Sequence, residues 1–330
     1  MTLDVRSIGS SAPSAEPAGP RTRGAPFALE VSELAVRYAN GVAAIRGVSL
    51  NVRPGECLAI VGESGSGKST VALAALGLLP PGAQIEGRIT VAGMDVVGAT
   101  ERQLRSIRGL SIGYVAQDPM RSFDPLRRVG SSVGEAWAVH GLRPPPHAVQ
   151  DALGALGIDE PGERARLRPH QWSGGMLQRA SIAAANAHTP QIVVADEPTS
   201  ALDADRADAV LSALRSTQAA VLLISHDLEL VGRHSDRVAV MYAGRIVEHG
   251  CASDMLKSPR HPYARALLAA SPRPGHGLPI PLRGAPPRLD RALIGCAFAP
   301  RCDHRQDRCA LEEPESVDQC ACWSPRSAPE

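Results

Sequence analysis

The sequence predicts an α/β fold built on a largely parallel sheet, and three observations carry this prediction. Continuous apolar runs of the kind that form strands buried on both faces occur three times, as "CLAIV" (57–61), "QIVVA" (191–195) and "AAVLLIS" (219–225). Segments with helical patterns separate these runs along the chain. A glycine-rich loop follows the first run and precedes a helix, which is a strand–loop–helix unit of α/β proteins.

Length and composition set the limits of the prediction. The chain has 330 residues, of which 44% are hydrophobic but only 3% are aromatic, so we expect one large domain with an aliphatic core and a small appendage. The formal net charge is +1, with acidic and basic residues interleaved, and this gives no sign of a nucleic-acid partner. No apolar run reaches the roughly 18 residues of a membrane helix. Residues 1–26 have no apolar signal region, so we expect a disordered tail there and a cytoplasmic protein.

The other elements follow from apolar periodicity and turn residues. Strands are expected within 28–53, at the three apolar runs, and as strand pairs over 85–97 and 237–250. Helices are expected over 68–78, 100–108, 173–187, 203–217 and 261–270. Residues 118–171 read as irregular or helical, and the Pro- and Gly-rich stretch 272–290 reads as a linker.

The loop "GESGSGKST" (62–70) fits the phosphate-binding pattern G-x-x-x-x-G-K-[ST] between a strand and a helix. Its glycines let backbone N–H groups approach phosphate oxygens, and the helix N-terminus favours negative charge. Lys68 would face the β- and γ-phosphates, and Ser69 would offer its hydroxyl to Mg²⁺. The residues expected to bind nucleotide here are Gly62, Glu63, Ser64, Gly65, Ser66, Gly67, Lys68, Ser69 and Thr70.

The stretch "IVVADE" (192–197) ends a predicted strand with two carboxylates. Asp196 is expected to hold Mg²⁺, usually through water, and Glu197 to polarise the water that attacks the γ-phosphate. An ordinary strand ending in an acidic turn would look the same in isolation. The phosphate loop elsewhere in the chain favours the functional interpretation.

The stretch "WSGGMLQR" (172–179) predicts a second anion site at a helix N-terminus, this time without a lysine. Ser173 is a good N-cap, and Gly174 and Gly175 leave the first backbone N–H groups uncovered. Two phosphate-binding ends on one chain are useful together if two chains meet head to tail.

Read in order, these motifs resemble the ATP-binding cassette of the ABC family over roughly 28–250. "GESGSGKS" resembles Walker A, "IVVADE" resembles Walker B, and "WSGGM" resembles the signature with Trp for the usual Leu and Met for the usual Gln. "VAQDPM" carries the Q-loop glutamine, "SALD" (200–203) resembles the D-loop, and "ISHDL" carries the switch histidine. Tyr38 precedes Gly62 at the distance where the family has an aromatic ring against adenine.

The resemblance implies a P-loop cassette over 27–250 with an antiparallel β subdomain and a helical subdomain at about 118–187. It implies ATP and Mg²⁺ as ligands, with Mg²⁺ held by Ser69, Gln117 and Asp196. The residues it implies for catalysis are Glu197, His226, Gln117 and Lys68. The remaining residues it implies for nucleotide binding are Tyr38, Ser173, Gly174, Gly175 and Asp203.

Four segments resemble the ATP-binding subunits of oligopeptide and dipeptide importers: "AQDPMRSFDP" (116–125), "SGGMLQR" (173–179), "HPYARALLAASP" (261–272) and "GCAFAPRC" (295–302). This branch implies separate transmembrane permease subunits, contacted through about 118–142. It also implies an identical or paralogous ATPase partner, and an extracytoplasmic solute-binding protein as an indirect partner. The location would be the cytoplasmic face of the membrane.

Three alternatives stay open at this point. Relatives in the same branch import nickel or other small solutes. Non-transport ABC ATPases act in DNA repair or translation, although the interval between Walker A and the signature lacks a coiled coil and the chain has one cassette. The third alternative is a metal-binding sensor built on a degenerate cassette. Against it stand four intact residues, namely Lys68, Asp196, Glu197 and His226.

Five of the seven cysteines lie within 295–323, a Cys-rich module that follows a helix and linker over 251–294 and precedes a tail over 324–330. In a cytoplasmic protein such a cluster predicts a metal site more than a disulfide knot. The family tail ends in Cys followed by His or an aromatic residue, so the resemblance favours Cys322 over Cys320 as the fourth ligand. The ligands it implies are Cys296, Cys302, Cys309 and Cys322. A [4Fe–4S] cluster, zinc, and bare thiols or disulfides all remain open.

Overall fold

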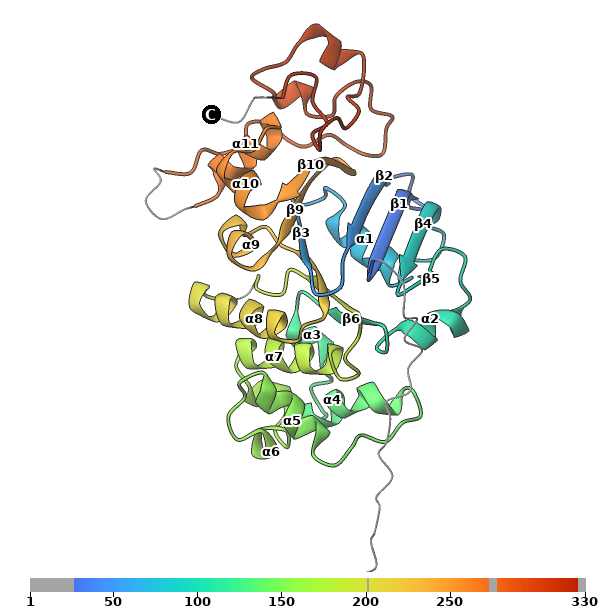
Figure 1. Ribbon diagram of the computed structural model, residues 1–330, viewed down its shortest axis with the longest axis vertical. Helices are drawn as coiled ribbons and strands as arrows, with labels where there is room; N and C mark the ends of the chain where they lie inside the picture. Colours follow the sequence, from blue (N-terminus) through green and yellow to red (C-terminus); the bar gives the residue numbers. More distant parts are fainter. Residues whose placement is uncertain (1–26, 201, 273–277, 326–330) are drawn as a thin grey trace, which may run out of the picture.

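The computed structural model describes residues 27–200, 202–272 and 278–325 (Figure 1). The tail expected over 1–26 lies outside the described residues, as do Ala201 of the "SALD" stretch and the end of the chain over 326–330.

A six-stranded sheet forms the centre of the molecule, in the order β10-β9-β3-β8-β7-β6. All neighbouring strands are parallel except β9 and β10, which form an antiparallel pair. The three apolar runs form buried parallel strands inside this sheet, as predicted. The strands are β3 (Cys57–Val61), β6 (Ile112–Val115), β7 (Ile192–Asp196), β8 (Ala220–Ile224), β9 (Arg237–Tyr242) and β10 (Arg245–Cys251).

A four-stranded antiparallel sheet, in the order β2-β1-β4-β5, stands beside the central sheet with α1 (Lys68–Ala75) between the two (Figure 1). Helix α1 shares one buried hydrophobic core with both sheets. This confirms the α/β cassette fold, with a mostly parallel sheet and an antiparallel β subdomain, that the sequence predicted. The strands are β1 (Leu29–Arg37), β2 (Ala43–Val52), β4 (Gln84–Val91) and β5 (Met94–Asp95).

The first of the remaining helices packs on the α1 side of the central sheet, and the others cover the opposite face or form a helical end that is green in Figure 1. They are α2 (Glu101–Ile107), α3 (Pro119–Ser122), α4 (Val129–Ala138), α5 (Ala148–Ala155), α6 (Pro161–Arg164), α7 (Gly174–Ala185), α8 (Ala204–Ser216), α9 (Leu228–His234), α10 (Ala252–Lys257) and α11 (Pro262–Ala270). Strand β6 and the short helices α9 and α10 were not among the elements expected from the sequence.

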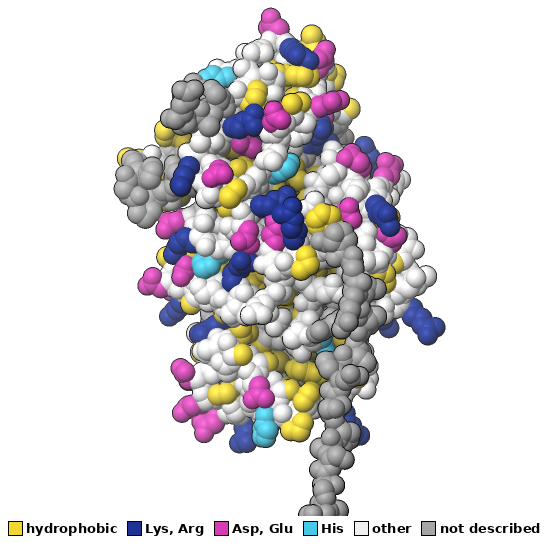
Figure 2. Space-filling view, viewed as in Figure 1, with side chains coloured by type: hydrophobic (Ala, Val, Ile, Leu, Met, Phe, Trp, Pro, Cys, Tyr) yellow, Lys and Arg dark blue, Asp and Glu magenta, His cyan; other side chains and the backbone are white. Residues whose placement is uncertain are grey.

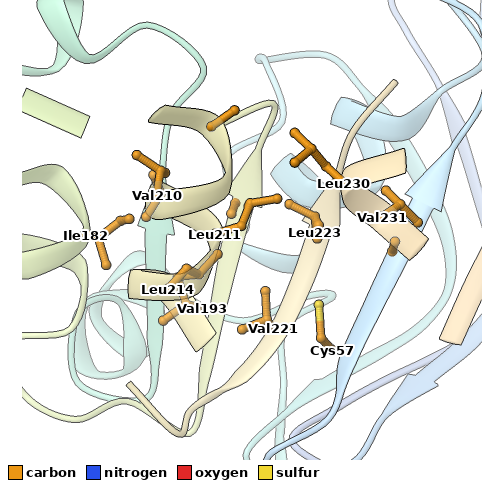
Figure 3. Packing of buried hydrophobic residues seen from close by; sticks show 14 of the residues in the cluster. Cys57, Ile182, Val193, Val210, Leu211, Leu214, Val221, Leu223, Leu230 and Val231 are labelled. Carbon is orange, nitrogen blue, oxygen red and sulfur yellow. The ribbon is translucent and has the colours of Figure 1, made fainter. Parts of the chain in front are cut away.

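The strands of the central sheet divide their side chains between two hydrophobic cores. On β3, Leu58 and Ile60 pack with α1, whereas Ala59 and Val61 belong to the core on the opposite face. Side chains from α8 and α9 complete this second core, and Figure 3 shows Leu211 and Leu230 above the strands. Burying each such side chain contributes roughly 1.5–3 kcal/mol, so both faces hold the sheet in place.

The surface carries acidic and basic side chains side by side on the face shown in Figure 2. This agrees with the interleaved charges of the sequence. Within the described residues, no helix is both long enough and apolar enough to pass through a bilayer.

The C-terminal module, residues 295–323, lies at the end of the molecule that is red in Figure 1. Its described part contains two one-turn 3₁₀ helices, Ala299–Arg301 and Asp307–Ala310. It is joined to β10 by a hydrogen bond from the Ala321 N–H to the Val247 carbonyl. Glu313 of the module also pairs with Arg46 at 2.7 Å and with Arg245 at 2.8 Å.

Candidate functional site

A pocket of about 750 Å³ opens over the phosphate loop. Its wall includes Lys68 and Ser69 at the start of α1, Gln117 after β6, Glu197 after β7 and His226 after β8. Because neighbouring parallel strands end at the same edge of the sheet, side chains distant in sequence meet here. The structure thus brings together the groups predicted from four separate motifs.

Two glycines of the loop are required by close contacts. A Cβ atom at Gly62, whose φ is +153°, would collide with the carbonyl of Met241 on β9. A Cβ atom at Gly67, with φ of +106°, would lie 2.5 Å from the carbonyl of Ala44 on β2. The loop therefore fits between the two sheets only with glycine at these positions.

Lys68 is buried, and its ammonium group donates hydrogen bonds to the carbonyls of Gly62 at 2.8 Å and Glu63 at 3.0 Å. Burial lowers the pKa of Lys68 from its ordinary value, and the nearby carboxylates of Glu197 and Asp196 act in the opposite direction. A buried ammonium held only by carbonyl dipoles is a good partner for an incoming phosphate.

Asp196, at the end of β7, accepts a hydrogen bond from the Ser69 hydroxyl at 3.1 Å. Burial raises the pKa of Asp196, and the Ser69 hydrogen bond opposes this effect. The hydroxyl and the carboxylate are hard oxygen donors of the type that Mg²⁺ prefers. This pair fits the predicted Mg²⁺ site in its chemistry and its proximity.

Glu197 receives contacts from two other predicted residues. The Gln117 side chain donates to Glu197 Oε2 at 3.1 Å, and His226 Nδ1 lies 3.4 Å from the same oxygen. The backbone of Glu197 has φ of +45°, which is uncommon for a residue other than glycine. Strained backbone of this kind clusters at functional sites, where the surrounding structure holds a side chain in one position.

Tyr38 also lines the pocket, and its hydroxyl lies 2.9 Å from the hydroxyl of Thr70. Part of the pocket lining comes from residues that sequence analysis missed: Leu267, Ala270, Ser271, Leu282 and Leu289. They belong to α11 and to the stretch expected to be a linker. The Leu289 carbonyl accepts a hydrogen bond from the Ala43 N–H at 2.8 Å, so this part of the supposed linker is attached to β2.

The signature residues lie away from this pocket. Ser173 caps α7 by accepting a hydrogen bond from the Met176 N–H, and Gly174 and Gly175 follow it near Leu202. Asp203 caps α8 in the same way. None of Ser173, Gly174, Gly175 and Asp203 is among the residues that line the pocket over the phosphate loop.

A second cavity in the C-terminal module is lined by four of its cysteines, namely Cys296, Cys302, Cys309 and Cys322. The fifth, Cys320, is not part of this lining; it is buried, and it pairs through its backbone with Glu248 of β10. Burial, with smaller contributions from the neighbouring Cys309 and Cys322, raises the pKa of Cys296 to about 11.

The four thiols fit a metal centre in their chemistry and in facing one cavity. Among the described residues, however, no three His, Cys, Asp or Glu side chains have the spacing that a metal ion requires.

Two family models match the chain. Residues 45–200 match the ABC transporter model, and residues 247–309 match the model of the oligopeptide/dipeptide transporter C-terminal region.

Several characterised proteins are similar over most of the chain. The dipeptide transport ATP-binding protein DppD of Bacillus subtilis is 42% identical over 82% of this chain and 84% of its own length. The oligopeptide transport ATP-binding protein OppD of Escherichia coli is 38% identical over 90% of this chain and 93% of its own length. OppD of Mycobacterium tuberculosis is 42% identical over 88% of this chain, and the chain spans about half (50%) of that protein.

Solved structures share the cassette fold. A dimeric ATP-binding cassette in a post-hydrolysis state with ADP and phosphate matches with a TM-score of 0.59 and 26% identity, over 68% of this chain and 98% of that chain. A cassette from Clostridium perfringens, part of an ABC transporter complex, matches with a TM-score of 0.62 and 27% identity, over 71% of this chain and 92% of that chain. Together with the motifs and the fold, these similarities show that the chain belongs to the oligopeptide/dipeptide family of ABC transporter ATP-binding proteins.

Proposed function

We propose that this protein binds and hydrolyses ATP to drive the import of dipeptides or oligopeptides through separate permease subunits. The observation that carries the proposal is the Glu197 carboxylate, which Gln117 and His226 both approach at the rim of the phosphate-loop pocket. A carboxylate held in this way can orient a water molecule for in-line attack on a γ-phosphate.

The other site residues have complementary roles in this proposal. The backbone N–H groups of the phosphate loop bind the phosphates, and Lys68 exchanges its two carbonyl contacts for phosphate oxygens. Ser69, Asp196 and Gln117 hold Mg²⁺, which would neutralise charge on the β- and γ-phosphates. His226 contacts the transferred group from beside Glu197, and Tyr38 packs against the base.

We further propose that two cassettes close on two ATP molecules. The separation of Ser173, Gly174, Gly175 and Asp203 from the chain's own pocket supports this arrangement, because a second chain could supply these groups across the interface. The γ-phosphate carries the charge that two opposed helix N-termini share, whereas ADP lacks it. The dimeric state of the similar ADP-bound cassette is consistent with this cycle.

Peptides are the proposed cargo because the names of the similar proteins refer to dipeptide and oligopeptide transport. Permease subunits, a paralogous or identical ATPase and, indirectly, a solute-binding protein are the proposed partners. The protein would act at the cytoplasmic face of the membrane, attached through the permease. Met120 and Leu126, which are exposed in the segment expected to contact the permease, are suitable docking residues.

We propose a [4Fe–4S] cluster for the C-terminal module, with Cys296, Cys302, Cys309 and Cys322 as its ligands. Four thiols that line one cavity match the number of cysteine ligands that such a cluster takes. When bound, such a cluster would act as a structural staple for a module that has little secondary structure of its own. The thiols would have to lose their protons on binding, and burial raises the pKa of Cys296, Cys302 and Cys322.

The proposed function is tested by reconstituting the protein with its permease subunits and solute-binding protein in vesicles. The wild-type protein should hydrolyse ATP and accumulate labelled dipeptides or tripeptides. The Lys68→Ala variant should lose both activities because it loses phosphate contacts.

Two outcomes would contradict the proposal in different ways. Nickel uptake without peptide uptake would leave the ATPase role standing and replace the cargo. ATP turnover that does not respond to permease or solute would favour a non-transport ATPase.

A further inference from the structure

The C-terminal module contacts the phosphate loop directly, through an ion pair that joins residues 238 positions apart. Arg301 Nη1 donates to Glu63 Oε2 at 2.6 Å, and Arg301 Nη2 donates to Glu63 Oε1 at 3.0 Å. Glu63 is the second residue of the loop, next to Gly62. The Arg301 side chain is 5% exposed and that of Glu63 is 25% exposed, so the bidentate pair is largely shielded from solvent.

Other contacts fix the guanidinium group on its remaining sides. Arg301 Nε donates to the Arg283 carbonyl at 2.7 Å, and Arg301 Nη1 also lies 3.3 Å from the Tyr242 hydroxyl. These contacts, together with the Glu63 ion pair, hold the Arg301 guanidinium group in one position. A planar guanidinium held in this way loses little further freedom when it binds a carboxylate.

The backbone of Glu63 is held as well. Its N–H donates to the hydroxyl of Tyr263 on α11 at 2.8 Å, and Tyr263 is completely buried. The Tyr263 ring packs against Tyr242 at 4.4 Å and against Phe298 at 5.4 Å between ring centres. Phe298 comes immediately before the 3₁₀ turn that carries Arg301.

We propose that Arg301 is a positioning residue for the phosphate loop, which makes ATP affinity depend on the docked C-terminal module. Fixing the Glu63 side chain and N–H orients the two peptide units that flank Glu63, and the carbonyls of these units, those of Gly62 and Glu63, accept hydrogen bonds from Lys68. Arg301 therefore acts on nucleotide through the loop and through Lys68. Arg301 is not among the residues that line the nucleotide pocket, so its effect should appear in nucleotide binding and not in the chemical step.

The same arrangement connects the loop to the cysteine cavity. Arg301 directly precedes Cys302, and Phe298 and Ala299 line the cavity together with Cys296 and Cys302. A rearrangement of this cavity would move the turn that carries the guanidinium. The inference rests on the proposed function only in assuming that the phosphate loop binds ATP.

The test measures ATP affinity by equilibrium titration of the full chain with a fluorescent ATP analogue, and KM and kcat in the reconstituted complex. Arg301→Gln should raise Kd and KM about tenfold, a change equivalent to ~1.4 kcal/mol, while kcat at saturating ATP stays near the wild-type value. Arg301→Lys, which keeps the charge but not the bidentate geometry, should recover part of the affinity.

Glu313→Gln is the matched control, because it removes the ion pairs of the same module to Arg46 and Arg245 without touching the phosphate loop. Its Kd should stay within about twofold of wild type, a difference of ~0.4 kcal/mol. Equal weakening by Glu313→Gln and Arg301→Gln would overturn the inference, because general loosening of the module would then explain both.

A double-mutant cycle supplies the second criterion. If the pair acts as a unit, Glu63→Gln combined with Arg301→Gln should weaken ATP binding no more than either change alone. If the two effects instead multiply, so that the double variant binds ATP about a hundredfold more weakly than wild type, the inference is overturned. Lys68→Ala separates the two levels of the proposal: if it binds ATP normally, the proposed function fails. If Lys68→Ala loses binding and folded Arg301→Gln does not, only this inference fails.

Discussion

The nucleotide pocket lies at the ends of hydrogen-bonded strands, whereas the cysteine cavity lies among loops whose described part contains two 3₁₀ turns. In the pocket, Asp196 already bonds to Ser69 and Glu197 to Gln117 without any ligand. Four thiols line the cavity, but no three potential ligands among the described residues are placed to hold a metal ion. Strand pairing sets the positions of side chains at a sheet edge, but a loop module must obtain this order from contacts to the cassette or from its ligand.

The largest expected effect concerns Glu197. Glu197→Gln should lower ATP turnover about 100- to 10 000-fold, because the amide is a much poorer proton acceptor, while ATP binding persists and a closed dimer accumulates. Phosphate release and size-exclusion chromatography with ATP would measure the two properties. Near-normal hydrolysis in the assembled complex would show that the preassembled carboxylate is not the catalytic group.

The next prediction concerns the metal content of the cysteine cavity. After anaerobic purification, Cys322→Ser should lose most of its iron and sulfide, whereas Cys320→Ser should keep them, because Cys320 does not line the cavity. Metal analysis and an absorbance spectrum provide the measurement. Wild-type protein with neither iron nor zinc, and with all five thiols of the module freely titrating, would refute a metal centre.

Gly62 tests how rigid the cassette scaffold is. Gly62→Ala should lower the free energy of unfolding by about 3 kcal/mol, because the new Cβ collides with the Met241 carbonyl. Gly65→Ala is the control: its φ of +78° is unfavourable for alanine, but nothing lies within 4 Å of the new Cβ, so a loss of about 1 kcal/mol is expected. Denaturant titration would detect the difference, and equal losses would contradict the claimed close fit.

The stability of the region around the cysteine cavity, which His261 helps to line, should fall in acid. Burial lowers the pKa of His261 to about 4 from 6.5, and its Nδ1 accepts the Tyr263 N–H at the start of α11. The unfolded chain therefore takes up a proton first, so this stability is present above pH 6.5 and declines as the pH falls toward 4. The expected loss at pH 5 is about 2 kcal/mol.

Comparison with His261→Asn isolates the contribution of His261 to this pH dependence, because asparagine also caps helices but does not titrate. The buried carboxyl of Glu248, whose pKa burial raises, accepts the His261 N–H and titrates in the opposite sense, but it is common to both proteins. Thermal unfolding of the two proteins between pH 5 and 7.5 should diverge only below about pH 6.5. Parallel curves would mean that His261 is not buried in neutral form.

The sequence predicted the parts of the fold and site that depend on local pattern. Lys68 and Glu197 sit in motifs directly after apolar strands, and parallel pairing then brings them together without further information. Strand β6 was not predicted because it is short and contains Gly113, whose missing side chain leaves room for the Ala185 carbonyl of α7. The contact of Arg301 was not predicted for a different reason. Its partner lies 238 positions away, and no local sequence pattern indicates such a contact.

The wall supplied by Leu267, Leu282 and Leu289 has a consequence for how this chain can be divided. Neither matched segment, 45–200 or 247–309, contains the whole nucleotide pocket, since Tyr38 precedes the first and His226 falls between them. Grafting the C-terminal region of one relative onto the cassette of another would therefore also exchange part of the ATP-binding surface. In this protein the stretch that has to be exchanged as one piece to preserve nucleotide binding runs from Tyr38 to Arg301, across the limits of both segments.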